Sequence, residues 1–76
     1  MTYNELDSIA VPGEPFGLRN ASGVIVDKWE GEEDGRRGVW LGVEIPRDDG
    51  TSYGIADLFV GPDGLELIGV MEFSQF

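Results

Sequence analysis

Apolar and polar side chains alternate along most of this chain from residue 16 onward, which is the period-two pattern of β-strands. The clearest run, residues 24–29, is rich in β-branched residues and closes with an aromatic one, as is typical of a strand. Clusters of glycine and proline separate the runs. The pattern predicts five strands, at residues 16–19, 24–29, 39–45, 52–60 and 65–73.

The first ten residues follow a different period. Residues 2–5 match a capping box, with threonine as the N-cap and glutamate three positions later. Leu6, Ile9 and Ala10 have the spacing of one helical face, and Pro12 ends the pattern. We therefore expect an N-terminal helix of about two turns that docks on the sheet, because so short a helix does not persist alone.

Together these elements predict an α+β fold that is mainly β: a short N-terminal helix followed by a five-stranded antiparallel meander, in a strongly curved sheet or a small barrel. Residues 1–76 are expected to form a single small acidic domain. Two tight turns, at residues 47–50 and 61–64, set the register of the last three strands. Their symmetric closure predicts two cross-strand pairs, Leu41 with Ala56 and Leu58 with Leu67.

The two faces of this sheet differ in character. The expected core face is apolar and comprises Val39, Leu41, Val43, Ala56, Leu58, Val60, Leu65, Leu67 and Met71. The opposite face mixes large apolar groups with carboxylates and comprises Trp40, Glu44, Tyr53, Ile55, Asp57, Phe59, Glu66, Ile68, Val70 and Glu72. Either residues 16–29 cover part of this mixed face within a curled sheet, or the face stays open and binds a partner.

Composition narrows the classes of function. The chain has a net charge of -10 and contains neither histidine nor cysteine, so the usual proton shuttle and thiol nucleophile are missing. We predict that the protein is not an enzyme and needs no cofactor. The charge argues against direct binding of nucleic acid or of an anionic membrane, and favours a basic protein as partner. No basic residue opens the N-terminus as in a signal peptide, so we expect a cytoplasmic protein.

Residues 30–38 contain no apolar side chain and are predicted to be a mobile loop or a wide hairpin connection. Their carboxylates, joined by Asp27, Glu44, Asp57 and Glu72, can form an anionic strip that competes for a basic groove, or they form an ordinary solvated surface. No calcium-loop pattern is present, so no metal site and no catalytic residue are predicted. The predicted partner-binding residues are Trp29, Glu30, Glu32, Glu33, Asp34, Trp40, Asp57 and Phe59, with the tryptophans as anchors.

In size, acidity and lack of catalytic side chains, the whole chain is similar in kind to small phage-encoded inhibitors of host defence, including anti-CRISPR and anti-restriction proteins. It is also similar to bacterial toxin-immunity proteins. The likeness lies in bulk properties, so no functional residue is carried over. It implies an inhibitor that blocks a basic nucleic-acid-binding site of a target protein or complex. The alternatives are an immunity protein or a small oligomerising structural module, such as a homodimer formed through the mixed face or a strand edge.

Overall fold

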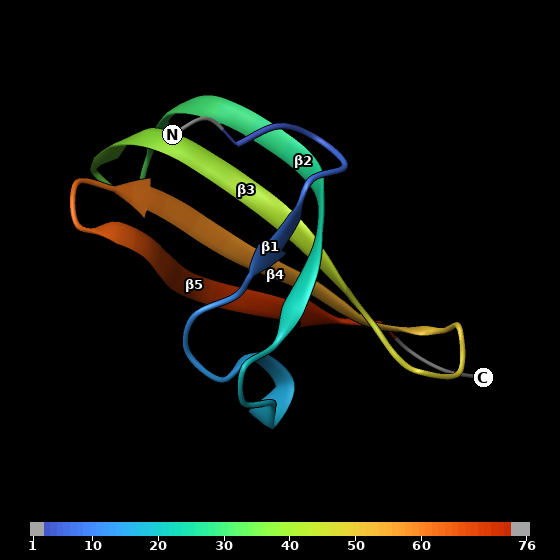
Figure 1. Ribbon diagram of the computed structural model, residues 1–76. Helices are drawn as coiled ribbons and strands as arrows, with labels where there is room; N and C mark the ends of the chain where they lie inside the picture. Colours follow the sequence, from blue (N-terminus) through green and yellow to red (C-terminus); the bar gives the residue numbers. More distant parts are fainter. Residues whose placement is uncertain (1–2, 74–76) are drawn as a thin grey trace.

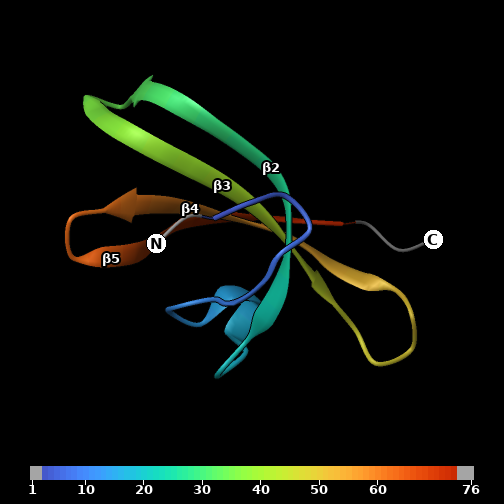
Figure 2. The same ribbon diagram turned by 45° about the horizontal axis from the view of Figure 1, so that its top comes forward.

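The computed structural model describes residues 3–73. They form one antiparallel sheet in which the strands lie in chain order, and the sheet curves into a half-barrel. Figures 1 and 2 show this twist and curvature, which bring the N-terminal segment round to the side of the last strand. The elements are β1 (Ser8–Ala10), the 3₁₀ turn η1 (Pro15–Gly17), β2 (Ser22–Glu33), β3 (Arg36–Pro46), β4 (Ser52–Gly61) and β5 (Gly64–Glu72).

The predicted N-terminal helix is wrong, and with it the α+β class, because residues 3–73 contain no α-helix. Leu6 has a left-handed φ of 72° and its N–H donates to the carbonyl of Ile25, 2.7 Å away. The segment then continues as β1, in which Ile9 pairs with Gly23 of β2. A two-turn helix is marginal in water, whereas a strand gains hydrogen bonds from an edge that already exists. Thr2 of the proposed capping box lies outside the described residues.

The strand predicted at residues 16–19 is also wrong. Phe16 and Gly17 have φ values of 56° and 76°, which turn the chain at η1 instead of extending it. The ring of Phe16 stacks on Tyr53 with centroids 5.8 Å apart, and Leu18 packs against the core. The sheet therefore takes its fifth strand from residues 8–10 rather than from residues 16–19.

Residues 30–38 form a regular hairpin instead of a mobile loop or a wide connection. β2 and β3 stay paired out to Glu33 and Arg36, and only Asp34 and Gly35 form the turn. These two residues have φ values of 53° and 78°, as a type I′ turn requires, and Asp-Gly is a preferred sequence for it. The acidic residues here are thus held on a rigid ribbon.

The other hairpins also turn at aspartate and glycine. The β3–β4 connection contains Asp49-Gly50 and closes by a hydrogen bond of 2.7 Å from the N–H of Arg47 to the carbonyl of Thr51. The β4–β5 turn consists of Pro62 and Asp63 and is followed by Gly64. Figure 1 shows these two turns at opposite ends of the sheet.

The observed register confirms one predicted cross-strand pair and corrects the other. Leu58 pairs with Leu67 as expected, but Leu41 also pairs with Leu58, and Val43 is opposite Ala56. The turn after β3 is longer than the predicted one and an irregularity follows Ile45, so the register shifts by two residues and the faces are kept.

The core lies on the concave face of the half-barrel. Its buried apolar residues come from β2, β3 and β4 and from the segments that flank β1 and β2: Val11, Ala21, Ile25, Leu41, Val43, Ile45, Ala56 and Leu58. Met71, which was predicted to be a core residue, is 58% exposed and pairs with Ile55. A bulge in the β4–β5 ladder beside Leu58 adds one residue to β5 and reverses the faces beyond it.

Lys28, the single lysine of the chain, fastens the N-terminal segment to the sheet. Its Nζ donates a hydrogen bond of 2.6 Å to the carbonyl oxygen of Tyr3, whose side chain packs against the core. Within residues 3–73, no helix has the length and apolar character needed to cross a membrane.

Candidate functional site: an acidic hollow beside stacked tryptophans

Three aromatic rings form a row on the convex face of the sheet, here called the aromatic row: Trp29, Trp40 and Phe59. They are cross-strand neighbours on β2, β3 and β4 because Trp29 pairs with Trp40 and Trp40 with Phe59. The indole rings stack with centroids 5.7 Å apart and planes 13° from parallel, and Trp40 meets Phe59 at 4.6 Å. Trp40 and Phe59 are only 6% and 5% exposed, whereas Trp29 is 40% exposed. The row is a second apolar cluster outside the main core.

Two glycines of the β2–β3 hairpin give the outer rings their space. A side chain at Gly31 would meet the Trp29 ring at 2.9 Å, and one at Gly38 would meet the Phe59 ring at 2.9 Å. The rings therefore lean toward the hairpin tip and cover the glycine backbone. The indole N–H of Trp40 also points this way and makes a long hydrogen bond of 3.4 Å to the carbonyl of Gly31.

Arg36, at the start of β3, fastens the hairpin tip to the sheet. Its guanidinium lies 4.3 Å from the centre of the Phe59 ring. It also donates two hydrogen bonds, of 2.9 and 2.8 Å, to the carboxylate of Glu66 on β5. This paired donation lowers the pKa of the Glu66 carboxyl. Because Arg36 reaches across β4, the hairpin tip with Glu33 and Asp34 is drawn toward the convex face.

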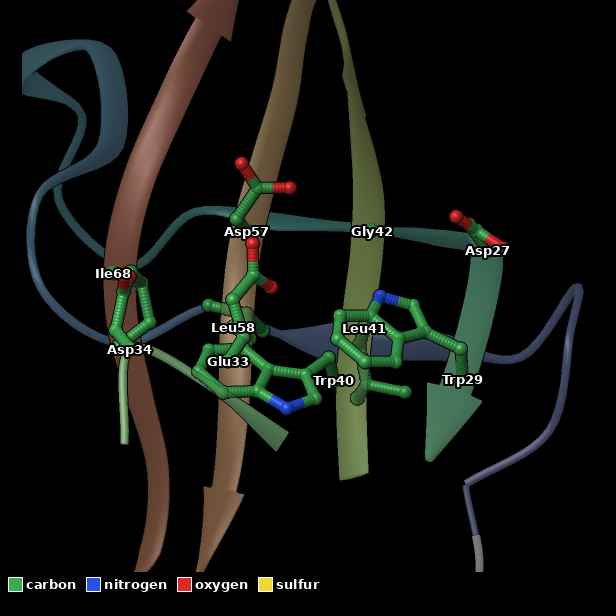
Figure 3. Close-up of a pocket in the computed structure, with 10 residues that line it drawn as sticks. All are labelled: Asp27, Trp29, Glu33, Asp34, Trp40, Leu41, Gly42, Asp57, Leu58 and Ile68. Carbon is green, nitrogen blue, oxygen red and sulfur yellow. The ribbon is translucent and has the colours of Figure 1, made fainter. Parts of the chain in front are cut away.

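Two carboxylates project from the same face of the sheet, each two residues along its strand from a ring of the aromatic row. Asp27 on β2 and Asp57 on β4 both pair with Gly42 of β3, so no side chain separates them. Partial burial, and to a lesser degree the charge of Asp27, raise the pKa of the Asp57 carboxyl. In Figure 3 the two carboxylates lie on either side of Gly42, with both indole rings on one side of them.

These groups enclose a hollow of about 280 Å³, here called the acidic hollow. Four carboxylates and two tryptophans contribute to its wall (Figure 3). Its floor is the strand backbone of Leu41, Gly42 and Leu58, whose leucine side chains lie in the core, together with Ile68. Its lining residues are Asp27, Trp29, Glu33, Asp34, Trp40, Leu41, Gly42, Asp57, Leu58 and Ile68. No lysine or arginine is among them, so the negative charge of the wall is not compensated there.

The chemistry of this wall suits an organic cation. Carboxylates accept hydrogen bonds from guanidinium and ammonium groups, and the exposed face of an indole attracts the same groups through its electron-rich ring. Among residues 3–73, no cluster of three or more histidine, cysteine, aspartate or glutamate side chains is placed to hold a metal ion.

Five of the eight predicted partner-binding residues come together at the acidic hollow: Trp29, Glu33, Asp34, Trp40 and Asp57. Of the two predicted anchors, only Trp29 is accessible to a partner, because Trp40 is buried within the protein's own aromatic row. Phe59 is likewise buried, beneath Arg36. On the mixed face, Trp29 therefore covers Trp40 and Arg36 covers Phe59. The same face is open to solvent at Ile68.

Glu30 and Glu32, the remaining predicted residues, do not line the hollow. Glu32 lies opposite Arg37 on the hairpin, with a distance of 3.7 Å between its carboxylate oxygen and the guanidinium nitrogen. Glu30 lines a separate, open depression together with Arg37 and Val39. Along β2 these two carboxylates alternate with Asp27 and Glu33 and so project from the other face of the hairpin.

The partner-binding set chosen from the sequence omitted Asp27, Gly42 and Arg36. A signal for the first was present, since Asp27 and Trp29 are two positions apart in the strand predicted at residues 24–29 and must share a face. The pairing of Gly42 with both aspartates depends on register across three strands. The role of Arg36 depends on the curl of the hairpin.

No family model, no curated protein sequence and no solved structure matches this chain.

Proposed function

We propose that this chain is a non-enzymatic, acidic inhibitor that docks on a basic protein and occupies the site where that protein binds nucleic acid. The observation that carries the proposal is the acidic hollow, in which four uncompensated carboxylates surround two tryptophans on a rigid sheet. A nucleic-acid-binding site presents clustered arginine and lysine side chains, which are the groups that this wall accepts.

The rigidity of the surface supports inhibition by occupancy. The carboxylates of Glu33 and Asp34 are on a type I′ hairpin whose tip is fastened by Arg36, and Asp27 and Asp57 are on paired strands. Because the backbone that carries these carboxylates is already ordered, little backbone entropy is lost on binding, so more of the interaction energy appears as affinity. The net charge of -10 also speeds the encounter with a cationic protein.

The test starts from the protein that co-purifies with a tagged copy of the chain from its native cells. The purified pair is titrated with wild-type chain, with a D27N/D57N variant and with a D48N/D63N variant. The control variant changes the net charge by the same amount at two exposed turn positions outside the hollow. We expect affinity to fall at least tenfold, about 1.4 kcal/mol, in D27N/D57N and to change little in the control.

The target's nucleic-acid binding is measured in the same titration. Competitive loss of bound nucleic acid as the chain is added supports the proposal. Equal affinity of the two double variants would remove the hollow from the interface. A captured partner that binds no nucleic acid, such as a toxin with a different activity, would instead favour the immunity function.

A further inference from the structure

The second half of β5 is a free sheet edge. β5 is the last strand of the sheet, and within residues 3–73 no strand pairs with its outer side. Its first half is partly covered, because Gly13 lies against the Leu67 side chain and Leu65 lines a hollow beneath the β1–η1 connection. The 3₁₀ turn η1 also packs against β5, and the Phe16 ring reaches Gly54, the ladder partner of Glu72. Within residues 3–73, however, no backbone hydrogen bond is made to the outward side of residues 68–72, so their outward donors and acceptors can accept another strand.

This free edge is apolar in an otherwise acidic protein. Ile68, Val70 and Met71 are 42%, 45% and 58% exposed, and Glu72 at its end is the only charged residue among residues 68–72. Exposed apolar edges of this kind are the usual sites of strand addition, in which backbone hydrogen bonds supply affinity and alternate side chains supply selectivity.

A row of positions leads from this edge to the acidic hollow. Across β2, β3, β4 and β5, successive partners in the ladder are Asp27, Gly42, Asp57 and Gly69. The space where a side chain of Gly69 would stand contains no atom within 4 Å. Asp57 is therefore open to a group that arrives over Gly69 from beyond the edge.

Strand spacing sets what can make that approach. Adjacent strands are about 4.8 Å apart, so a strand added beside β5 lies about 10 Å from the backbone of Asp57. That separation is within the combined reach of an extended arginine or lysine side chain and an aspartate. A cationic residue opposite Gly69 meets the Asp57 carboxylate, whose charge Asp27 already disfavours.

We propose that an extended basic segment of the partner pairs with residues 68–72 of β5 as a sixth strand and sends an arginine or lysine side chain over Gly69 to Asp57. This inference rests on the proposed function and specifies how the partner is held. Charge decides the occupant: a second copy of the chain would bring together two surfaces of net charge -10, and β5 has no basic residue to offset them.

The probe is a blocked seven-residue peptide that alternates arginine and valine. Binding is followed through the amide resonances of isotope-labelled protein and through hydrogen exchange. We expect the largest shifts and slowed exchange in residues 68–72, with the amides of β1 unchanged. A peptide with proline in place of each valine keeps the charge but cannot act as a strand. It should bind at least tenfold more weakly.

Three substitutions test the path over Gly69, and a fourth is the matched control. Gly69→Leu fills the row without changing charge and should weaken the arginine–valine peptide at least tenfold. Gly69→Ala serves as the milder variant, because its added carbon meets no neighbour and the fold accepts it. Asp57→Asn should weaken binding to a similar extent, and Asp63→Asn, the matched control at the β4–β5 turn, should not.

The outcomes separate this inference from the proposed function. Equal binding of the proline peptide, or shifts confined to Trp29 and the hairpin tip, would overturn strand addition and leave a basic partner in the hollow intact. A stable dimer in sedimentation with residues 68–72 protected would also overturn it, since a second copy would then be the occupant. If the D27N/D57N variant binds the native partner as tightly as wild type does, the proposed function itself is wrong.

Discussion

Replacing Phe59 by leucine tests whether the aromatic row is a second core that holds the hairpin over the sheet. The Phe59 ring is 5% exposed, meets Trp40 at 4.6 Å and lies 4.3 Å beneath the Arg36 guanidinium. Leucine keeps most of the apolar volume, so a well-packed exchange costs up to about 1.5 kcal/mol. Loss of the aromatic pair with Trp40 adds about 0.5–1.5 kcal/mol.

We therefore expect F59L to lower the free energy of unfolding by about 2 kcal/mol. That is a large share of the total, because a chain of 76 residues has a stability of about 4–11 kcal/mol. Urea unfolding followed by tryptophan fluorescence measures the change directly, with the m-value as a check on two-state behaviour.

The matched control is F73L, the same exchange at a ring that is 36% exposed. It should stay within about 0.5 kcal/mol of wild type. Near-UV circular dichroism gives a second readout, because the Trp29–Trp40 stack should lose order when its support is removed. If F59L matched the control in stability and spectrum, the aromatic row would not be holding the hairpin.

Three further predictions concern charge and backbone. Asp57→Asn should raise the free energy of unfolding by up to about 0.5 kcal/mol, because the raised pKa of Asp57 makes its ionised form unfavourable in the fold and solvent screens most of that effect. This gain in the free energy of unfolding should shrink as pH falls through the raised pKa of Asp57. An Asp57→Asn variant that is less stable than wild type in urea at pH 7 would contradict the prediction. The pKa of Glu66 is lowered instead of raised, so ionised Glu66 stabilises the fold. This stabilisation is present above the unfolded pKa of about 4.3 and is lost as pH falls through the pKa of the folded state. Thermal unfolding of Glu66→Gln should accordingly depend less on pH below about 4 than wild type does, and an unchanged acid limb would argue against the Arg36 contact. Gly35→Ala should cost about 1–2 kcal/mol, because φ is 78° there and no neighbour lies within 4 Å of the added carbon, so an unchanged urea midpoint would refute the turn geometry.

The alternation of side chains was sufficient to predict most of the sheet. The predicted strands at residues 24–29, 39–45 and 52–60 are confirmed as parts of β2, β3 and β4, and the one at 65–73 as β5, which ends one residue earlier at Glu72. Their residues are β-branched or aromatic and favour extended backbone wherever they pair. The helix was wrong because its signals were local, while the backbone of Leu6 and Ile9 is held by hydrogen bonds to β2, more than a dozen residues away.

The hairpin and the bulge show where alternation stops being informative. The run from Glu30 to Gly38 lacks apolar residues, so its pairing depends on the Asp34-Gly35 turn rather than on burial. The assignment of Met71 failed because one extra residue in β5 reverses the faces, and no local pattern marks that position.

The candidate site could be predicted in part for the same reason. Parity within the predicted strand at residues 24–29 puts Asp27 and Trp29 on one face. It reaches Glu33 only because β2 continues to that residue, where the pattern predicted a loop. Which tryptophan is exposed depends on the curl of the hairpin, which buries Trp40 between two other rings and leaves one face of Trp29 free.

Each of the three long hairpins turns at or beside an aspartate followed by glycine: Asp34-Gly35, Asp49-Gly50 and Asp63-Gly64. Glycine is required for the turn, but its lack of a side chain also leaves its amide nitrogen free to attack the preceding carboxyl and form a succinimide. Reopening of that ring inserts an extra backbone carbon as isoaspartate. The dipeptide that shapes the meander is thus also its point of chemical ageing, and at Asp34 such ageing would alter the wall of the acidic hollow without changing the mass of the protein.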